Sequence, residues 1–159
     1  MLASCRTELR HCLFDLRSDA LETGDFRAAI ETCLGELKLS SAINVDFPVD
    51  RSRFHDATVH AILCIIRELS ANAFNHGHAT SIDIQGRLKN DRLILSVHDN
   101  GCGFDPASHP GVAEGHFGLH GVEERLNRLR GTFRIETSPG RGTTALCEIP
   151  ANGKTSLEK

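Results

Sequence analysis

A long apolar segment between residues 56 and 75 constrains the fold of this chain more than any other feature. Its core-facing positions recur at steps of three and four residues, the period of a helix with one face in a core; they are Thr58, Ile62, Ile65, Ile66, Leu69 and Ala73. Glu68, Asn72 and His76 stand four residues apart, so they form a polar stripe along the same helix. This stripe is either a solvated edge or a set of functional side chains, because polar groups in a core need partners.

Segments with the two-residue period of β-strands flank this helix. We expect strands at 43–47, 81–88, 92–98, 132–137 and 143–149. An Asn90-Asp91 turn is expected between the second and third strands. The order of helices and strands predicts an α/β fold, a two-layer sandwich whose mixed β-sheet is covered on one face by helices.

Two further helices are expected, one before the central helix in the sequence and one after it. Asp25 is a plausible N-cap for a helix whose apolar stripe is Phe26, Ala29, Ile30, Cys33, Leu34 and Leu37. A later helix is expected over residues 119–130. Gly77 and Gly131 are placed to end the central and the later helix. Residues 100–117 fit no periodic element and are expected to form a mobile loop.

Composition excludes several classes of protein. The 159 residues are expected to form one domain, and a net charge of −3 predicts no nucleic-acid partner. Six cysteines without a Cys-x-x-Cys pair favour reduced thiols and a cytoplasmic setting, and the nine histidines lack the spacing of a zinc site. No uninterrupted run of about 18 apolar residues and no signal peptide is present, so we expect no membrane span in this chain.

Two glycine-rich segments could hold a nucleotide. Asp99 follows a strand and precedes Gly101 and Gly103, where a carboxylate can accept a hydrogen bond from an amino group while the glycines let backbone approach a base. Gly118-Leu119-His120-Gly121 precedes a helix whose free N–H groups favour anionic oxygens. Taken singly, the first segment is more commonly a β-turn, and the second is equally a glycine-rich helix start.

Together with Glu68, Asn72 and the Gly140-Arg141-Gly142-Thr143-Thr144 segment, these boxes resemble the asparagine box and the glycine boxes of the GHKL superfamily of ATP-binding domains, the Bergerat fold. The resemblance implies ATP and Mg²⁺ as cofactors, with Asn72 as the metal ligand and Asp99 on the adenine amino group. It implies Glu68 and His76 as catalytic residues, although Glu68 is equally read as a carboxylate that only supports the site. The implied cofactor-binding residues are Asn72, Asn75, Asp99, Gly101, Gly103, Gly118, Leu119, Gly121, Thr143 and Thr144.

Finer details resemble sensor histidine kinases of the nitrate/nitrite-sensor group. Residues 14–26 resemble the end of a dimerisation helix and its connection, and the short loop before Gly118 separates the chain from gyrase and mismatch-repair ATPases, which carry long lids. The implied organisation is a dimerisation remnant over 1–24, an ATP-binding catalytic domain over 25–150 and a disordered tail over 151–159. One departure is Asn75, where this group usually has a phosphate-binding lysine.

The resemblance implies a protein histidine kinase that transfers the γ-phosphoryl group of Mg-ATP to a histidine on a separate dimerisation domain, with a response regulator downstream. The isolated chain is expected not to phosphorylate itself, because none of its histidines has the acceptor setting. The domain is expected in the cytoplasm, and an inner-membrane parent is left open. Two alternatives are an anti-sigma-factor type of serine kinase and a non-catalytic module that binds a nucleotide or a partner.

Overall fold

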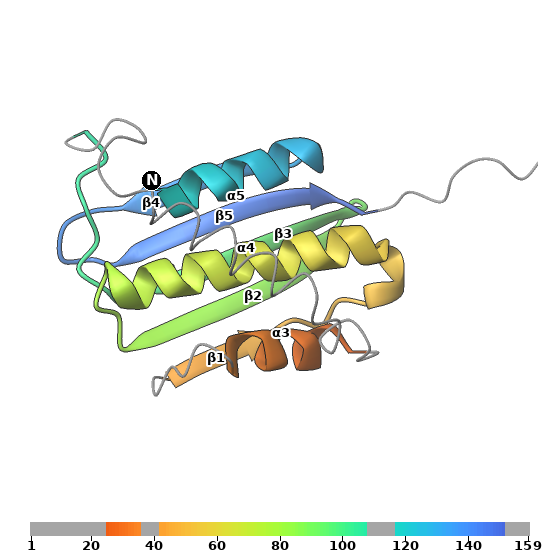
Figure 1. The fold of residues 1–159 in the computed structure, drawn as a ribbon, viewed down its shortest axis with the longest axis horizontal. Helices are drawn as coiled ribbons and strands as arrows, with labels where there is room; N and C mark the ends of the chain where they lie inside the picture. The colour runs from red at the N-terminus through yellow and green to blue at the C-terminus, as the bar shows by residue number, and fades with distance from the viewer. Residues whose placement is uncertain (1–24, 36–41, 108–116, 152–159) are drawn as a thin grey trace, which may run out of the picture.

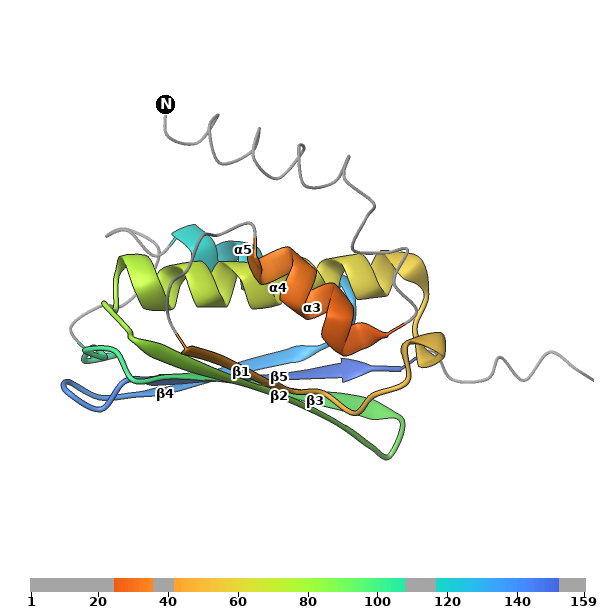
Figure 2. The same ribbon diagram turned by 90° about the horizontal axis from the view of Figure 1, so that it is seen from below.

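The computed structural model describes residues 25–35, 42–107 and 117–151. Within these ranges the helices lie in one layer and the strands in another (Figures 1 and 2). The helices are α3 (Phe26–Gly35), the 3-10 helix η1 (Arg51–Arg53), α4 (Asp56–Asn75) and α5 (Phe117–Arg128). The expected dimerisation remnant, Leu37, half of the expected mobile loop and all but the first residue of the expected tail lie outside the described residues.

The strands form a single mixed sheet in the order β1-β2-β3-β5-β4. Their bounds are Ala42–Asp46 for β1, Ser81–Lys89 for β2, Arg92–Asp99 for β3, Thr132–Thr137 for β4 and Thr143–Pro150 for β5. β1 pairs with β2 in parallel, and the remaining neighbours pair antiparallel. The predicted two-layer sandwich with a mixed sheet is therefore confirmed.

α4 is the central helix of the covering layer. α3 and α5 lie on either side of it, so more of its surface is buried than the predicted stripe (Figure 2). Val59, Leu63 and Cys64 are buried in addition to the stripe, whereas Thr58 is only half-buried. By length and composition α4 could cross a membrane, with a mean hydropathy of 1.2, but half of that window is buried inside the domain. The apolar surface of α4 thus serves the core.

α3 joins this core through a cluster of aromatic rings. The Asp25 Oδ1 accepts the Arg27 N–H at 3.1 Å, which confirms the predicted N-cap. The Phe26 ring lies 4.8 Å from the Phe47 ring and 6.0 Å from the Phe54 ring, measured between centroids. These contacts fix α3 over the β1 edge of the sheet (Figure 1).

The backbone at several turns differs in detail from the expectation. Asn90 and Asp91 both have positive φ, as the predicted two-residue hairpin turn requires. At the ends of α4 and α5, however, the left-handed residues are His78 (φ 51°) and Arg130 (φ 56°), not Gly77 and Gly131. Gly77 and Gly131 are instead required because neither position has space for a side chain. A Cβ would lie 2.7 Å from a backbone carbonyl oxygen at Gly77 and 2.6 Å from one at Gly131.

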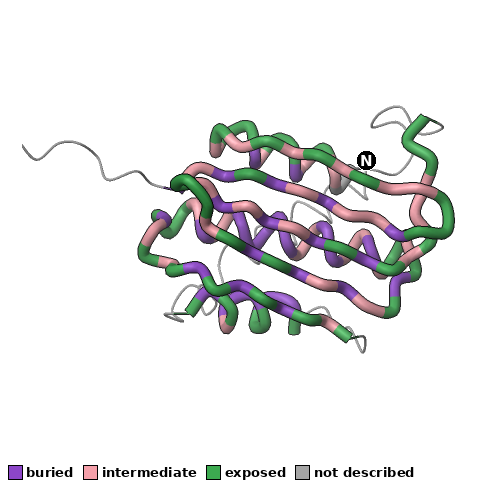
Figure 3. The backbone as a smooth tube through the Cα atoms, turned by 180° about the vertical axis from the view of Figure 1, so that it is seen from behind, coloured by how far each residue is buried: buried purple, intermediate pink, exposed green. Residues whose placement is uncertain are grey.

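The sheet buries one face only. Burial alternates along the strands in Figure 3, and along β3 the buried side chains are Leu93, Leu95, Val97 and Asp99. Asp99 therefore faces the helices at the point where β3 ends. At the other end of the sheet Ala151 is buried and its N–H donates to the Asp91 carbonyl at 2.8 Å, so Ala151, the first residue of the expected tail, is part of the folded domain.

Candidate functional site

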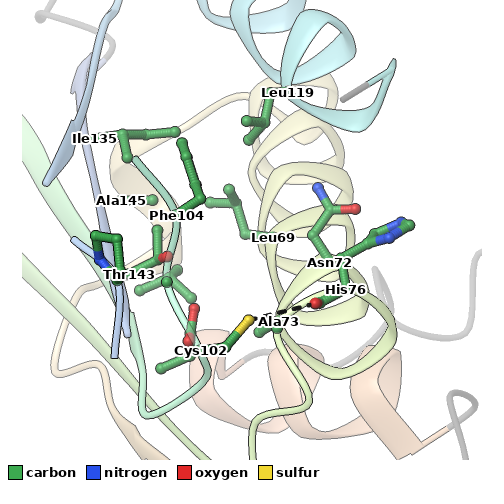
Figure 4. A pocket seen from close by; sticks show the side chains of 15 residues that line it. Leu69, Asn72, Ala73, His76, Cys102, Phe104, Leu119, Ile135, Thr143 and Ala145 are labelled. Atoms are coloured by element: carbon green, nitrogen blue, oxygen red, sulfur yellow. Dashed lines mark hydrogen bonds between the residues drawn. The ribbon is translucent and has the colours of Figure 1, made fainter. Parts of the chain in front are cut away.

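A cavity of about 430 Å³ opens between α4, α5 and the end of the sheet where β3 stops (Figure 4). This volume lies in the range of pockets that hold small molecules and cofactors. Its lining comes from segments far apart in sequence: Leu69, Asn72, Ala73, His76, Gly77, Val97, Asp99, Cys102, Gly103, Phe104, Leu119, Ile135, Pro139, Thr143 and Ala145. The lining is mostly apolar, with a few polar groups at defined positions.

Asp99 is the buried carboxylate of this cavity. The residue is 8% exposed, and its Oδ1 accepts the Gly101 N–H at 2.8 Å. No described residue donates a hydrogen bond to the Oδ2 atom, so one oxygen remains to accept from a ligand. The backbone of Asp99 pairs with Ile82 on β2 and Thr143 on β5, so the sheet holds this carboxylate from both sides.

Two glycines allow the backbone to close tightly around Asp99. Gly142 has φ +71°, and a Cβ there would lie 2.0 Å from the Asp99 carbonyl oxygen. Gly103 has φ +59°, and a Cβ there would lie 2.1 Å from the Ser138 carbonyl oxygen. Neither the left-handed conformation nor the space permits a larger residue. The predicted glycine boxes therefore have a direct steric cause at these positions.

Asn100 ties the loop after β3 to the connection that follows α4. Its Oδ1 accepts the Thr80 N–H at 2.9 Å and the Ser81 N–H at 3.0 Å, and its Nδ2 donates to the Thr80 hydroxyl at 2.9 Å. Next to it, the Cys102 N–H donates to the Gly77 carbonyl at 2.8 Å. These bonds hold the strand-end wall of the cavity against the α4 wall.

The α4 wall supplies Asn72 and His76 of the predicted polar stripe. Asn72 is half-buried, and its amide lies on the cavity side of α4 in Figure 4. His76 is exposed, and its carbonyl accepts from the Cys102 thiol at 3.7 Å. Glu68 is half-buried one turn before Asn72 and, like Asn75, does not line the cavity. The structure thus brings two of these four predicted residues to the site.

The predicted phosphate-binding glycines lie inside a helix and not before it. α5 begins at Phe117, so Gly118 and Leu119 lie in its first turn, where backbone N–H groups lack intrahelical partners, and Gly121 lies just after that turn. Of these three, only Leu119 lines the cavity. Any anion contact here therefore uses the helix N-terminus, which carries a partial positive charge.

The two predicted threonines of β5 face opposite sides of the sheet. Thr143 lines the cavity, whereas the Thr144 hydroxyl contacts the His98 Nδ1 at 2.8 Å on the sheet face that no described helix covers. The interpretation of Thr144 as a cofactor-binding residue is not supported by this position. Adjacent strand residues point to opposite faces, so only one of the pair can reach the site.

Several lining residues were missed from the sequence. Cys102 and Phe104 lie within the same glycine-rich segment as Asp99, so their proximity was a usable signal. Ile135 and Ala145 carried no signal beyond strand alternation, because they reach the cavity only through the pairing of β4 with β5. Together these residues give the cavity its apolar wall.

The cavity is poor in positive charge. Its described lining contains one carboxylate, Asp99, one histidine, His76, and no lysine or arginine. The sequence carries no lysine or arginine between Arg92 and Arg125. Among the described residues no three His, Cys, Asp or Glu side chains cluster as a metal site. Asn72 offers a neutral oxygen of the kind Mg²⁺ accepts when it keeps most of its waters and takes few protein ligands.

Comparisons with known proteins point to one family. Residues 59–153, more than half of the chain, match the family described as histidine kinase-, DNA gyrase B- and HSP90-like ATPases. The chain is 30% identical over 152 residues to the signal transduction histidine-protein kinase/phosphatase DegS of Brevibacillus brevis, covering 94% of this chain and 39% of DegS. It is 29% identical over 135 residues to the histidine-protein kinase/phosphatase UhpB of Salmonella typhimurium, covering 83% of this chain and 26% of UhpB.

The fold also has close counterparts among solved structures. The histidine kinase domain of a blue-light activated histidine kinase from Erythrobacter litoralis superposes with a TM-score of 0.65 at 20% identity, covering 79% of this chain and 59% of that one. At this identity the match shows the shared fold alone. The chain spans between about a quarter and two-fifths of the length of the curated relatives named above.

Proposed function

The chain belongs to the family of histidine kinase-, DNA gyrase B- and HSP90-like ATPases, and from this membership we propose that it is the Mg-ATP-binding catalytic domain of a sensor histidine kinase. The observation that carries the proposal is the position of Asp99. Its unpaired carboxylate oxygen and the Asn72 amide stand on different walls of one cavity of about 430 Å³. One wall can thus accept from a base while the other holds a hydrated metal ion.

Each part of the site has a role in this proposal. Asp99 accepts a hydrogen bond from the adenine amino group, and the apolar residues Phe104 and Ile135 cover the faces of the base. Asn72 holds Mg²⁺, which supplies charge neutralisation for the phosphate chain. The N-terminus of α5 contributes backbone N–H groups to the phosphates. Because no lysine or arginine stands in the described lining of the cavity, the metal and the helix terminus carry most of this neutralisation.

Catalysis in this arrangement is mostly positioning. The terminal phosphoryl group is presented to a histidine on a separate dimerisation domain, and its bond to the β-phosphate oxygen breaks as a bond to the imidazole nitrogen forms. Glu68 and His76 remain the predicted catalytic residues. His76 reaches the cavity directly, whereas Glu68 acts from one helical turn behind Asn72.

The wider context is proposed from the relatives. UhpB and DegS carry histidine-protein kinase/phosphatase in their names, which supports a two-component role with a response regulator downstream. We place this chain near the nitrate/nitrite-sensor group, with residues 1–24 as the dimerisation remnant. We infer that the domain works in the cytoplasm, and anchoring of its parent in the inner membrane stays an open prediction.

The lack of lysine and arginine among the described residues that line the cavity favours a second candidate function. A module that binds nucleotide or a partner without transferring phosphate needs no lysine at Asn75 and no arginine near the phosphates. If this module binds nucleotide, the two candidates share the nucleotide site and differ in phosphoryl transfer.

A titration followed by a reconstitution tests the proposal. ATP is titrated into the chain by calorimetry with and without Mg²⁺, and binding strengthened by Mg²⁺ is expected in the wild type but much less in Asn72→Ala. Radiolabelled ATP is then added with and without the phosphoacceptor domain of the parent, and label is expected on that domain only. No binding of ATP refutes the nucleotide site. Binding without transfer selects the non-catalytic module, and stable label on the isolated chain contradicts the expected absence of self-phosphorylation.

A further inference from the structure

Thr137 lies at the end of β4, outside the cavity lining, and its hydroxyl joins three neighbours. The Phe104 N–H donates to its Oγ1 at 3.1 Å, the Oγ1 donates to the Gly142 carbonyl at 3.0 Å, and the Thr143 hydroxyl lies 3.0 Å away. Thr137 and Thr143 are also paired in the β4–β5 ladder, so the backbone holds the two hydroxyls together.

The proton count of this cluster fixes the direction of each bond. A threonine hydroxyl has one proton and two lone pairs. The Gly142 carbonyl has no proton and can only accept, so it takes the single proton of Thr137. The Phe104 N–H occupies one lone pair of Thr137, and the remaining lone pair must accept from Thr143. The Thr143 hydroxyl is therefore the donor in its contact with Thr137.

The opposite direction leaves a polar group without its bond. If Thr137 donated to Thr143, the Gly142 carbonyl would lose its proton donor at a buried residue. A buried acceptor left unpaired costs free energy, whereas the arrangement above satisfies every hydroxyl valence of Thr137. Thr143, which lines the cavity, consequently presents lone pairs and no proton to a ligand.

We propose that Thr137 is a positioning residue that makes Thr143 an obligate hydrogen-bond acceptor, so that Thr143 and the Asp99 carboxylate together select a base bearing an amino group over one bearing a carbonyl. The backbones of Asp99 and Thr143 are paired neighbours on β3 and β5, and both side chains line the cavity. This inference rests on the proposed nucleotide site and adds a residue that acts on its specificity from outside the cavity lining.

A comparison of ATP with ITP tests this selection, because ITP carries a carbonyl oxygen where ATP carries the amino group. The ratio of the two dissociation constants is measured with Mg²⁺ for the wild type, Thr137→Val and Thr137→Ser. Valine frees the Thr143 proton, so the ATP preference is expected to shrink by about three- to tenfold, the worth of one hydrogen bond. Serine retains the hydroxyl and is expected to keep the wild-type ratio.

Thr132→Val is the matched control, because it makes the same substitution on the exposed side of the same strand. It is expected to leave the ratio unchanged. A general loss of packing lowers both affinities together and does not move their ratio, so an unchanged ratio in folded Thr137→Val overturns the inference.

Thr143→Val serves if Thr137→Val does not fold. Loss of an acceptor is expected to weaken ATP binding while ITP binding stays equal or improves, and an equal loss for both nucleotides overturns the inference. Failure of the wild type to bind either nucleotide instead refutes the proposed function, so the two failures are distinguishable.

Discussion

Asp99→Asn tests the base-binding wall with almost no change in shape. In the wild type the Gly101 N–H donates to the Asp99 Oδ1 at 2.8 Å. An asparagine amide nitrogen cannot accept that bond, so the asparagine must keep its oxygen toward Gly101 and turn its NH₂ group into the cavity. The acceptor that the proposed adenine contact needs is then replaced by a donor.

The expected loss is about 1 to 3 kcal/mol in the binding free energy, or about 5- to 150-fold in affinity for Mg-ATP. The charge change acts in the opposite direction, because removing a carboxylate favours an anionic ligand. Weaker binding therefore reports the lost acceptor and not the lost charge.

Calorimetric titration of Mg-ATP into the variant checks this value. Asp83→Asn is the matched control, because Asp83 lies on the neighbouring strand β2, faces away from the helices and pairs with His98. It removes the same charge without touching the cavity and is expected to leave affinity unchanged. Thermal melting without nucleotide shows whether each variant is folded. Equal or tighter binding by folded Asp99→Asn refutes the role of Asp99 in the site.

Three further outcomes follow from the structure. Gly142→Ala is expected to lower the free energy of unfolding in urea by at least about 2 kcal/mol more than Gly140→Ala. Both glycines have φ above +70°, but only a Cβ at Gly142 meets backbone, at 2.0 Å from the Asp99 carbonyl oxygen. Equal losses in the two variants would mean that the backbone relaxes around the new Cβ. Burial raises the pKa of the Cys147 thiol to about 12, above its unfolded value, so its contribution to stability is complete at lower pH and is lost as pH rises from about 9 to 12. In urea unfolding, Cys147→Ala should reduce this loss of unfolding free energy by up to about 1.4 kcal/mol per pH unit. The prediction is contradicted if the free energy of unfolding depends on pH in the same way in the variant and the wild type. Cys102 is exposed on the cavity wall, so iodoacetamide should alkylate it readily and Mg-ATP should slow that reaction in peptide mass spectra, whereas equal rates would place the nucleotide elsewhere.

The sequence alone predicted most of the architecture because local patterns repeat the periods of the elements. The apolar spacing of α4 gave its bounds, and the alternation of Ile82 and Ile84 marked the buried face of β2. Asp25 as a cap and Asn90-Asp91 as a turn depend on short-range chemistry and were confirmed. Asp99 was predicted as a site residue because a carboxylate at a strand end beside two glycines is a local pattern, and the structure places it in the cavity lining.

The sequence could not show which residues lie together on one wall of the cavity. Thr143 and Thr144 are adjacent in the chain, and a shift of one residue in strand register exchanges their faces. Only the pairing of β5 with β3 and β4 decided that Thr143 lies beside Asp99 and Thr137. The sequence also could not predict that His78 and Arg130 adopt the left-handed conformation. The glycine before His78 and the glycine after Arg130 are instead required because tertiary packing leaves no space for a Cβ.

Sequence by itself thus determined the described helices and strands and singled out the carboxylate of Asp99, which lines the cavity, since each depends on residues within a few positions of one another. Tertiary structure decided the cavity, because its walls come from α4, α5 and the ends of β3, β4 and β5. It also decided the direction of the Thr143 hydroxyl, because the N–H of Phe104, 33 residues from Thr137 in sequence, occupies one lone pair of the Thr137 hydroxyl. Such long-range contacts form only when the chain folds, and no local spacing encodes them.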